Sequence, residues 1–269
     1  MMRTVSTWSL HRTLGQYVAP DSGALGGPCR VGASEPVGMA LLDLPEALRQ
    51  HGYDTLQMCH FHLPSRSPED LASLRTSLWN AGITLDALLV DDGDLTDPAH
   101  ADQVEAWMGE WLETATALGA QRVRLMVGDA DPTPEVIRAS AGRLQRLAAA
   151  HPAVRIVVEN LTGVLQDARS VQAVLEATGG DVGLLIDLGN WRGPERFSEL
   201  ERIAPLAETC HAKCRFTGSD PDVAEFQRGV QVLKDAGYSG PMALIYDGVD
   251  DDEWVKLDLV DALCREVMG

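Results

Sequence analysis

Eight short apolar runs alternate with eight longer amphipathic runs along this chain of 269 residues, and this alternation constrains the fold more than any other feature. The apolar runs predict strands over residues 4–10, 54–62, 83–90, 121–128, 154–160, 181–189, 207–216 and 242–247. The amphipathic runs predict helices over residues 44–51, 68–81, 99–118, 133–151, 168–178, 195–204, 220–236 and 251–267. Strands that are apolar along their length are typical of a parallel sheet buried on both faces. The pattern therefore predicts an α/β fold, a single (β/α)8 TIM barrel over residues 1–269.

An open doubly wound sheet is the alternative arrangement of these elements, but no G-x-G-x-x-G motif follows any predicted strand. Several helices carry boundary signals in the sequence. Helix starts are indicated at Ser67–Pro68, Asp97–Pro98 and Thr133–Pro134, and helix ends at Gly82, Gly119 and Gly237.

One long irregular stretch, residues 13–43, lies between the first predicted strand and the first predicted helix. It is rich in Gly, Pro and Ser. Loops of this length in compact domains are usually functional or disordered, and a loop after a barrel strand lies over the active-site face. We interpret residues 13–43 as a candidate lid, with a non-functional insertion as the alternative.

The charge balance excludes some partners. The chain carries 22 basic and 40 acidic residues, a formal charge of −18, which disfavours nucleic acid and anionic membranes. The first residues lack the pattern of a signal peptide, and no apolar run is long enough to span a bilayer. The five cysteines are odd in number and form no C-x-x-C motif, which predicts a reduced, cytoplasmic protein.

Histidines gather at the carboxyl ends of the predicted strands, where the catalytic groups of a barrel lie. Four of the seven histidines are at or near such ends: His11, His60, His62 and His211. His60 and His62 are expected to share one side of the second strand, where substrate contact, a further metal position and a structural role are the alternatives.

Carboxylates occupy two neighbouring strand ends. Glu159 follows the apolar letters RIVV, and Asp187 follows GLLI. An ionised group beside a barrel core is costly unless it is paired or binds a cation. With His211 on the next strand, these acids predict a divalent metal site, for Mn²⁺, Co²⁺, Mg²⁺, Fe²⁺ or Zn²⁺.

Each of these residues also has a structural interpretation. Glu159 could pair with Arg155 or act as an acid at a helix start, and Asp187 could hold the turn at residues 189–190. A lone histidine such as His211 is more often a satisfied interior residue than a ligand. Trp191 is either a packing residue or an apolar wall of the pocket.

The ordered set of strand-end motifs resembles the xylose isomerase-like TIM barrels, the sugar isomerase/epimerase superfamily that also contains endonuclease IV. The matching segments cover most of the chain and read CHFHLP, DDGDLTDP, ALGAQRVRLMVG, VVEN, LIDLGN, CHAK and DAGYSGPMALIYDG.

The resemblance implies one divalent cation held by acids of the fifth, sixth and eighth strands and by the histidine of the seventh. Glu159, Asp187 and His211 match three of these positions. Many relatives read like IEYEG on the eighth strand, where this chain reads LIYDG and places Ile245 at the position of the ligand. Asp247 matches the second acid instead, about 6–7 Å further along the strand, and is the candidate fourth ligand.

The resemblance also implies a mechanism. In the epimerases of this group, two acids face each other across the substrate; one removes a proton beside a carbonyl and the other returns it on the opposite face, while the cation stabilises the enediolate. Glu159 is the expected base. Ile245 cannot be its partner, so the second acid is Asp247, His60 or His62, or is absent. Absence favours one-base chemistry, such as aldose–ketose isomerisation or dehydration.

The function implied is a divalent-metal-dependent isomerase, epimerase or dehydratase of a small sugar, polyol, keto-sugar or cyclitol. The side chains available to the substrate are His11, Arg12, His60, His62, Asn160, Asn190, Trp191 and Lys213. Lys213 could also stabilise an oxyanion or bind a carboxylate. The alternatives are a non-catalytic sugar-binding barrel and, least favoured, an endonuclease IV-type nuclease. Metal identity and oligomeric state, including a homo-oligomer, stay open.

Overall fold

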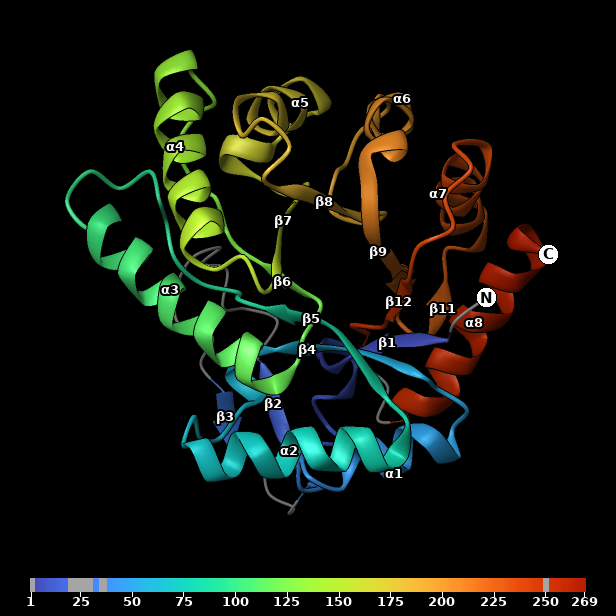
Figure 1. The fold of residues 1–269 in the computed structure, drawn as a ribbon. Coiled ribbons are helices and arrows are strands. Elements are labelled where there is room, and N and C mark those ends of the chain that lie inside the picture. The colour runs from blue at the N-terminus through green and yellow to red at the C-terminus, as the bar shows by residue number, and fades with distance from the viewer. Residues whose placement is uncertain (1–2, 19–30, 34–37, 249–251) are drawn as a thin grey trace.

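Eight parallel strands close into a barrel in the computed structural model, which describes residues 3–18, 31–33, 38–248 and 252–269 (Figure 1). The barrel strands are β1 (Thr4–Ser6), β4 (Thr55–Cys59), β5 (Thr84–Leu89), β6 (Arg122–Arg124), β7 (Arg155–Glu159), β8 (Gly183–Asp187), β9 (Ala207–Lys213) and β12 (Met242–Ile245). Strand β1 completes the ring because it pairs with both β4 and β12. The predicted TIM barrel is therefore confirmed.

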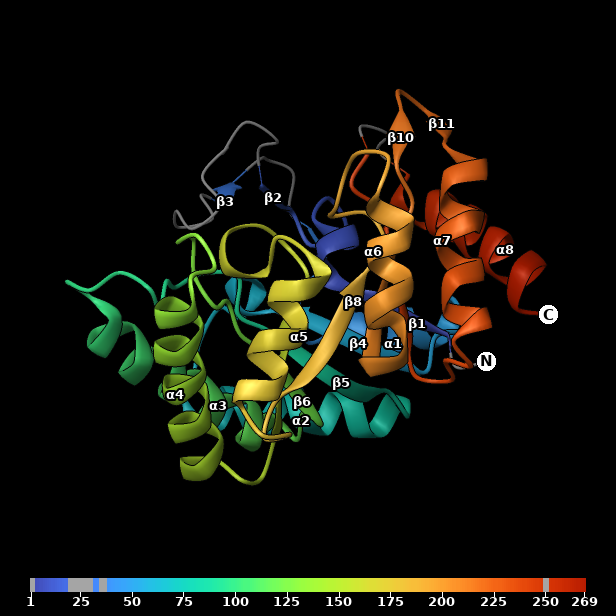
Figure 2. The ribbon, with the colours of Figure 1, turned by 90° about the horizontal axis from the view of Figure 1, so that it is seen from above.

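Helices surround the barrel on its outer side (Figures 1 and 2). Those found in the described ranges are α1 (Leu44–Gln50), α2 (Pro68–Ala81), α3 (Ala101–Leu118), α4 (Pro134–Ala150), α5 (Ala168–Ala177), α6 (Arg196–Ile203), α7 (Val223–Asp235) and α8 (Glu253–Met268). None of these helices combines the length and the apolar character needed to cross a bilayer.

Most barrel strands are shorter than predicted, including 121–128, of which β6 covers only Arg122–Arg124. In two of them the chain turns into a 3-10 helix. The segment predicted as strand 4–10 continues after β1 as η1 (Thr7–Leu10), and the segment 54–62 continues after β4 as η2 (His60–His62). Side chains of η1 replace the missing ladder bonds: Thr7 Oγ1 accepts from the Cys59 backbone N–H at 2.9 Å, and Ser9 Oγ accepts from that of Tyr246 at 2.8 Å. These bonds hold the strand ends together.

Two small antiparallel pairs stand at one end of the barrel (Figure 2). They are β2 (Gln16–Val18) with β3 (Val31–Ala33), and β10 (Phe216–Thr217) with β11 (Asp220–Pro221). Both follow a barrel strand, so they mark the face where the strands end. Residues 220–222, predicted as the start of a helix, precede α7 instead. The candidate lid 13–43 lies partly outside the described residues.

Helix caps follow the sequence signals at two of the three predicted starts. The hydroxyls of Ser67 and Thr133 accept from backbone N–H groups of the first turns of α2 and α4, each with proline at the first position. Asp97 differs, because its carboxylate accepts from the Ala99 N–H at 2.9 Å and closes a turn before α3 begins at Ala101. The predicted start of this helix was therefore two residues early.

The interior of the barrel contains a separate apolar cluster. Its buried members are Cys59, Ala87, Leu89, Val157 and Leu185. Trp8 and Phe61 pack against it from the 3-10 turns after β1 and β4. Val157 and Leu185 precede Glu159 and Asp187 by two residues on the same strands, so the barrel interior directly below these two acids is apolar.

The loop after β1 is fastened to the first residue of α8. Glu253 is buried, and its carboxylate accepts from the backbone N–H groups of Arg12 and Thr13 at 2.8 and 3.0 Å. The Thr13 hydroxyl adds a third bond at 2.9 Å. Glu253 thus holds the root of the long segment after β1.

We expect Glu253→Ala to lower the free energy of unfolding by about 1–3 kcal/mol, because it leaves two backbone donors and a hydroxyl without their acceptor. Urea unfolding of the variant against the parent measures this. The matched control is Glu176→Ala on α5, where the side chain is exposed and a change within about 0.5 kcal/mol is expected. Equal effects of the two substitutions would contradict the anchoring role of Glu253.

Candidate metal centre

Two carboxylates and one imidazole converge at the ends of β7, β8 and β9. Glu159, Asp187 and His211 each offer a ligand atom, and these atoms lie within 4.8 Å of one another. The three residues are 7%, 3% and 5% exposed. His211 Nδ1 is 3.3 Å from Glu159 Oε1 and 3.5 Å from Asp187 Oδ2. We call these three residues the triad.

The register of the parallel strands sets this arrangement. Asp187 of β8 pairs with His211 of β9, and Glu159 of β7 pairs with Leu185, two residues before Asp187. Residues two apart on a strand share a face, so all three side chains point into the barrel. The sequence prediction that these residues meet at one rim agrees with this geometry.

The triad and its neighbours shift each other's protonation. Burial alone would raise the pKa of Glu159, but His211 and Arg124 outweigh it and hold that pKa at about 2. Burial alone would lower the pKa of His211, but the carboxylates of Glu159 and Asp187 raise it to about 9. Without a cation, the triad therefore contains an ionised Glu159 beside an imidazolium.

Arg124 is the second cation beside Glu159, and the sequence analysis did not identify it. It lies on β6, is buried, and its Nε is 3.1 Å from Glu159 Oε2. Its guanidinium also pairs with Asp91 and donates to the Val90 carbonyl. The predicted alternative partner of Glu159, Arg155, instead binds Glu208 at 2.7 Å. The signal in the sequence was weak, because Arg124 is one of two arginines in the predicted strand 121–128.

Two asparagines predicted to bind substrate hold the triad in place. Asn160 accepts from the Asp187 N–H at 2.7 Å and donates to the Asp187 carbonyl at 3.0 Å. Asn190 donates to Glu159 Oε1 at 2.8 Å. Asp187 itself holds the following turn, because its Oδ1 accepts from the Gly189 N–H at 2.6 Å. Its other oxygen faces His211.

The histidines after β1 and β4 form two groups. His11 Nδ1 is 3.1 Å from His62 Nε2, and His62 Nδ1 is 2.8 Å from Thr7 Oγ1. Burial lowers the pKa of His11 to about 4 and that of His62 to about 3, so both rings are neutral at pH 7. His60 instead accepts from the Asp91 N–H at 3.1 Å.

The expectation that His60 and His62 share a side was wrong. It assumed strand geometry, whereas both residues lie in the 3-10 helix η2. The ring of His60 packs edge-on against Trp107 and Trp111 of α3, away from the pair of His62 with His11.

Lys213 and Asp247 form an ion pair beside the triad. Lys213 follows His211 by two residues on β9, and its Nζ is 2.7 Å from Asp247 Oδ2. Burial opposes the charge on Lys213, but Asp247 and the triad carboxylates raise its pKa. Asp247 lies outside the group of atoms within 4.8 Å, and its side chain is 35% exposed.

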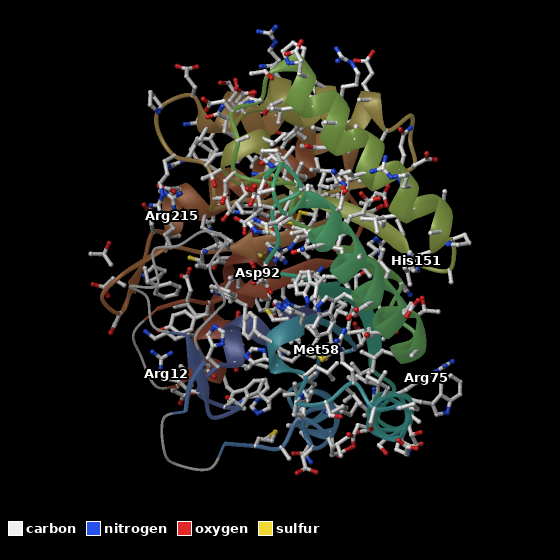
Figure 3. All side chains as sticks on the ribbon, turned by 90° about the vertical axis from the view of Figure 1, so that its left-hand side faces the viewer. Arg12, Met58, Arg75, Asp92, His151 and Arg215 are labelled. Atoms are coloured by element: carbon white, nitrogen blue, oxygen red, sulfur yellow. The ribbon has the colours of Figure 1, made fainter. Side chains whose placement is uncertain are left out.

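The two other predicted substrate contacts, Arg12 and Trp191, donate to backbone carbonyls. Arg12 donates to the Gly248 carbonyl at 3.4 Å, and Figure 3 places it on the same side of the molecule as Arg215, opposite His151. Trp191 is buried, and its indole N–H donates to the Leu161 carbonyl at 2.9 Å. Its contact with a substrate stays a prediction.

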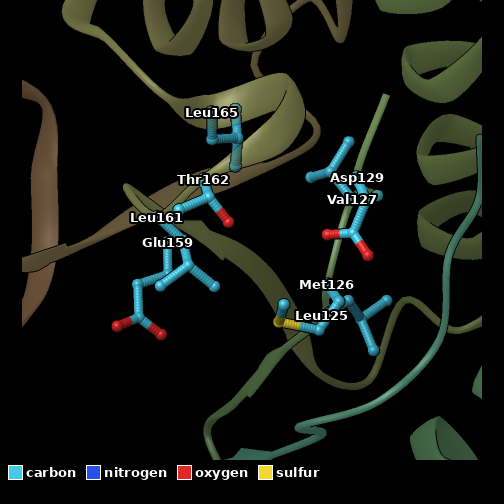
Figure 4. A pocket seen from close by; sticks show the side chains of 9 residues that line it. Leu125, Met126, Val127, Asp129, Glu159, Leu161, Thr162 and Leu165 are labelled. Atoms are coloured by element: carbon cyan, nitrogen blue, oxygen red, sulfur yellow. The ribbon is translucent and has the colours of Figure 1, made fainter. Parts of the chain in front are cut away.

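Two hollows differ in their relation to the triad. A small one of about 10 Å³, room for about one water molecule, lies between the segment after β6 and the end of β7, and is lined by Met126, Asp129, Glu159 and Thr162 among others (Figure 4). A larger one of about 580 Å³ lies on the outer wall between α3 and α4. Only the small hollow borders Glu159, so the larger one is not part of the candidate centre.

The sequence matches the family of xylose isomerase-like TIM barrels over residues 45–257, most of the chain. The chain belongs to this family. No functionally curated protein matched the sequence.

Several solved barrels share the fold at low sequence identity. The chain is 14% identical to a D-psicose 3-epimerase with D-tagatose from Clostridium cellulolyticum H10 (TM-score 0.68, 100% of each chain covered). It is 16% identical to a xylose isomerase-like TIM barrel protein from Mycobacterium smegmatis in complex with magnesium (TM-score 0.67, 100% of this chain and 97% of that chain). It is 10% identical to a probable 3-DHS dehydratase involved in petrobactin synthesis from Bacillus anthracis (TM-score 0.64, 100% and 99%).

The residues of this family member fit a divalent cation. Two carboxylates and an imidazole are suitable ligands for Mn²⁺, Co²⁺, Fe²⁺, Zn²⁺ or Mg²⁺. Both carboxylates face the same nitrogen, His211 Nδ1, and one N–H cannot make a linear bond to each. A cation could instead be bound by all three residues. Three protein ligands also leave positions open for a substrate.

The pH dependence of ion binding follows from His211. In the unfolded chain the pKa of His211 is near 6.5, and in the fold it is about 9. Protonated His211 therefore stabilises the metal-free fold fully below pH 6.5, and this stabilisation is lost as the pH rises through about 9. An ion at Nδ1 competes with the proton of His211, so the affinity for the ion rises as the pH rises. We expect affinity to rise about tenfold per pH unit between pH 6.5 and 8.5 and to level off above 9.

Calorimetry in two buffers of different ionisation enthalpy measures the proton released with each bound Mn²⁺. About one proton per ion is expected at pH 7.5. Release of none, with affinity constant across this range, would show that an ion does not displace the His211 proton.

Proposed function

We propose that this protein is a divalent-metal-dependent enzyme that moves a proton beside the carbonyl of a small sugar, keto-sugar or cyclitol. The observation that carries the proposal is the buried triad of Glu159, Asp187 and His211 at the strand ends of the barrel. Membership of a family with sugar epimerases among its structural neighbours supports the substrate class.

The triad would hold the ion and leave Glu159 as the base. A divalent cation supplies electrostatic stabilisation for negative charge that develops on neighbouring substrate oxygens. In the metal-free protein Glu159 is ionised at neutral pH because His211 and Arg124 hold its pKa low, and a bound cation would replace the charge of His211 in this effect. The Glu159 carboxylate accepts the proton of the carbon beside the carbonyl; the C–H electron pair forms a carbon–carbon double bond, and the carbonyl π pair moves to the oxygen, which gives an enolate. Asn190 keeps Glu159 Oε1 in a fixed position during this step.

Lys213 would donate a hydrogen bond to the developing oxyanion. Its ammonium group lies on the same face of β9 as His211 and is kept charged by Asp247. A charged donor directed at the substrate oxygen stabilises the enolate more than it stabilises the neutral carbonyl. In this role Asp247 is the partner of Lys213, and its partly exposed carboxylate connects the site with solvent.

Position 245 favours one-base chemistry. Ile245 of β12 is buried and pairs in register with Lys213, so an apolar side chain stands where two-base relatives carry an acid. With Glu159 as the acting base, the proton returns to the adjacent carbon in an isomerisation, or a neighbouring hydroxyl leaves as water in a dehydration. A dehydratase among the structural neighbours is consistent with the second outcome.

A sugar-binding protein without catalysis is the second candidate, and Ile245 is the observation that favours it. A nuclease is disfavoured by the charge of −18 and by the small number of ligands, because the described residues contain a single group of this kind.

The test is exchange of substrate protons with solvent deuterium. The Mn²⁺-loaded protein is incubated in D₂O with D-fructose, D-psicose, D-tagatose and a cyclitol ketone, and exchange is followed by NMR. We expect exchange with at least one compound, and a loss of about 10²–10⁴-fold or more with Glu159→Gln, which removes the base and also a ligand of the ion.

The matched control is Glu176→Gln, an exposed acid on α5, which should leave exchange unchanged. Binding of a panel compound with no exchange would favour the sugar-binding protein. Exchange that survives Glu159→Gln would remove Glu159 from the mechanism.

Restoring an acid at position 245 tests the missing ligand. We expect Ile245→Glu to tighten Mn²⁺ binding about tenfold or more, because the number of charged ligands sets the affinity. In EDTA the same variant should melt at a lower temperature than the parent, since its buried carboxylate has no cation. Ile245→Gln is the neutral control. Equal affinities of the two variants for Mn²⁺ would contradict the placement of residue 245 beside the ion.

A further inference from the structure

A chain of buried polar side chains lies behind the triad, inside the barrel. His211 Nε2 is 2.8 Å from Gln57 Oε1, and Gln57 Nε2 is 2.8 Å from Asp86 Oδ2. Thr209 completes the group: its hydroxyl lies 2.8 Å from Gln57 Nε2 and 2.9 Å from Asp86 Oδ2. Gln57, Asp86 and Thr209 are each fully buried.

The hydrogen bonds of this group leave one orientation for the Gln57 amide. Asp86 pairs with Arg122 through its other oxygen, and a carboxylate in such a pair accepts hydrogen bonds without donating any. The side of Gln57 that faces Asp86 must therefore be its NH₂ group. One amide hydrogen goes to Asp86, the second goes to Thr209, and the Thr209 hydroxyl donates to Asp86.

The orientation of Gln57 decides which nitrogen of His211 carries a proton. With its NH₂ group committed to Asp86 and Thr209, Gln57 presents its carbonyl oxygen to the imidazole. A carbonyl oxygen accepts only, so Nε2 must carry the hydrogen. In a neutral imidazole the lone pair is then at Nδ1, the atom that faces Glu159 and Asp187.

We propose that Gln57, oriented by Asp86, is a positioning residue that fixes His211 in the tautomer able to bind a divalent ion through Nδ1. This inference rests on the proposed metal-dependent function and adds residues of β4 and β5 to it. Partners of this kind set ligand orientation, and their removal commonly costs 10–100-fold in metal affinity. The loss is expected to matter here, since Ile245 supplies no fourth carboxylate.

A merely structural role makes a different prediction. The neighbouring inward positions Cys59, Leu89 and Val157 are apolar, so a leucine at position 57 would match them in character. If Gln57 only filled space, such a change would leave ion binding unaffected. If it fixes the tautomer, the change allows the proton at either nitrogen and weakens binding.

The experiment compares Zn²⁺ affinity, by chelator competition, in the full-length protein and its variants. Gln57→Leu is expected to bind about 10–100-fold more weakly than the parent. Thr55→Val, which alters another buried polar residue of β4 outside the chain to His211, should bind within about twofold of the parent. The double variant Gln57→Glu with Asp86→Asn places the carboxylate at position 57 and the amide at position 86. It keeps an acceptor for the Nε2–H of His211, so it should regain most of the Zn²⁺ affinity.

A second readout identifies the tautomer directly. Long-range ¹H–¹⁵N spectra of the Zn²⁺-loaded protein show which ring nitrogen of His211 carries the proton, independently of any turnover. The parent is expected to show the proton at Nε2, and Gln57→Leu to lose this fixed signal.

The outcomes separate this inference from the proposed function. In one outcome the parent binds Zn²⁺, Glu159→Gln abolishes this binding, and Gln57→Leu binds as tightly as the parent. This result would overturn the role of Gln57 and leave the metal site standing. A His211 proton at Nδ1 in the loaded parent would overturn it as well. A parent that binds no Zn²⁺ would overturn both.

Discussion

The hydrogen-bonded register of β7, β8 and β9 is the constraint on which the centre depends. It sets Asp187 beside His211 and Glu159 two residues below on the neighbouring strand. Side chains alternate between the two faces of a strand, so a slip of one residue would turn a ligand into the helix layer. The closed barrel makes such a slip costly because each strand is paired on both sides.

Charge balance explains how the barrel tolerates so many buried ionisable groups. Two carboxylates of the triad face one imidazolium, Arg124 lies between Glu159 and Asp91, and Lys213 faces Asp247. Each pairing lowers the cost of burial. A divalent ion would replace the proton of His211 in this balance, so protonation and ion binding compete at the same nitrogen. The burial of the triad strengthens these interactions, because electrostatic attraction is stronger away from water.

Much of the architecture could be predicted from the sequence, because eight strand–helix units and polar residues at strand ends are local patterns. The triad followed from Glu159 and Asp187 at the ends of two consecutive apolar runs and from His211 on the next predicted strand. What could not be predicted depends on pairings between distant segments. The 3-10 turn at His60–His62 is held by Thr7, more than fifty residues earlier, and so the two histidines diverge.

The link from Gln57 to His211 spans more than 150 residues, and its only local signal was a polar residue within a mostly apolar strand.

The central claim, one divalent ion held by the triad, is tested most directly by diffraction from crystals soaked in Mn²⁺. The account predicts a single strong anomalous peak at ligand distance from Glu159, Asp187 and His211 Nδ1. A map with no peak among these atoms, or with the ion held elsewhere, would contradict it.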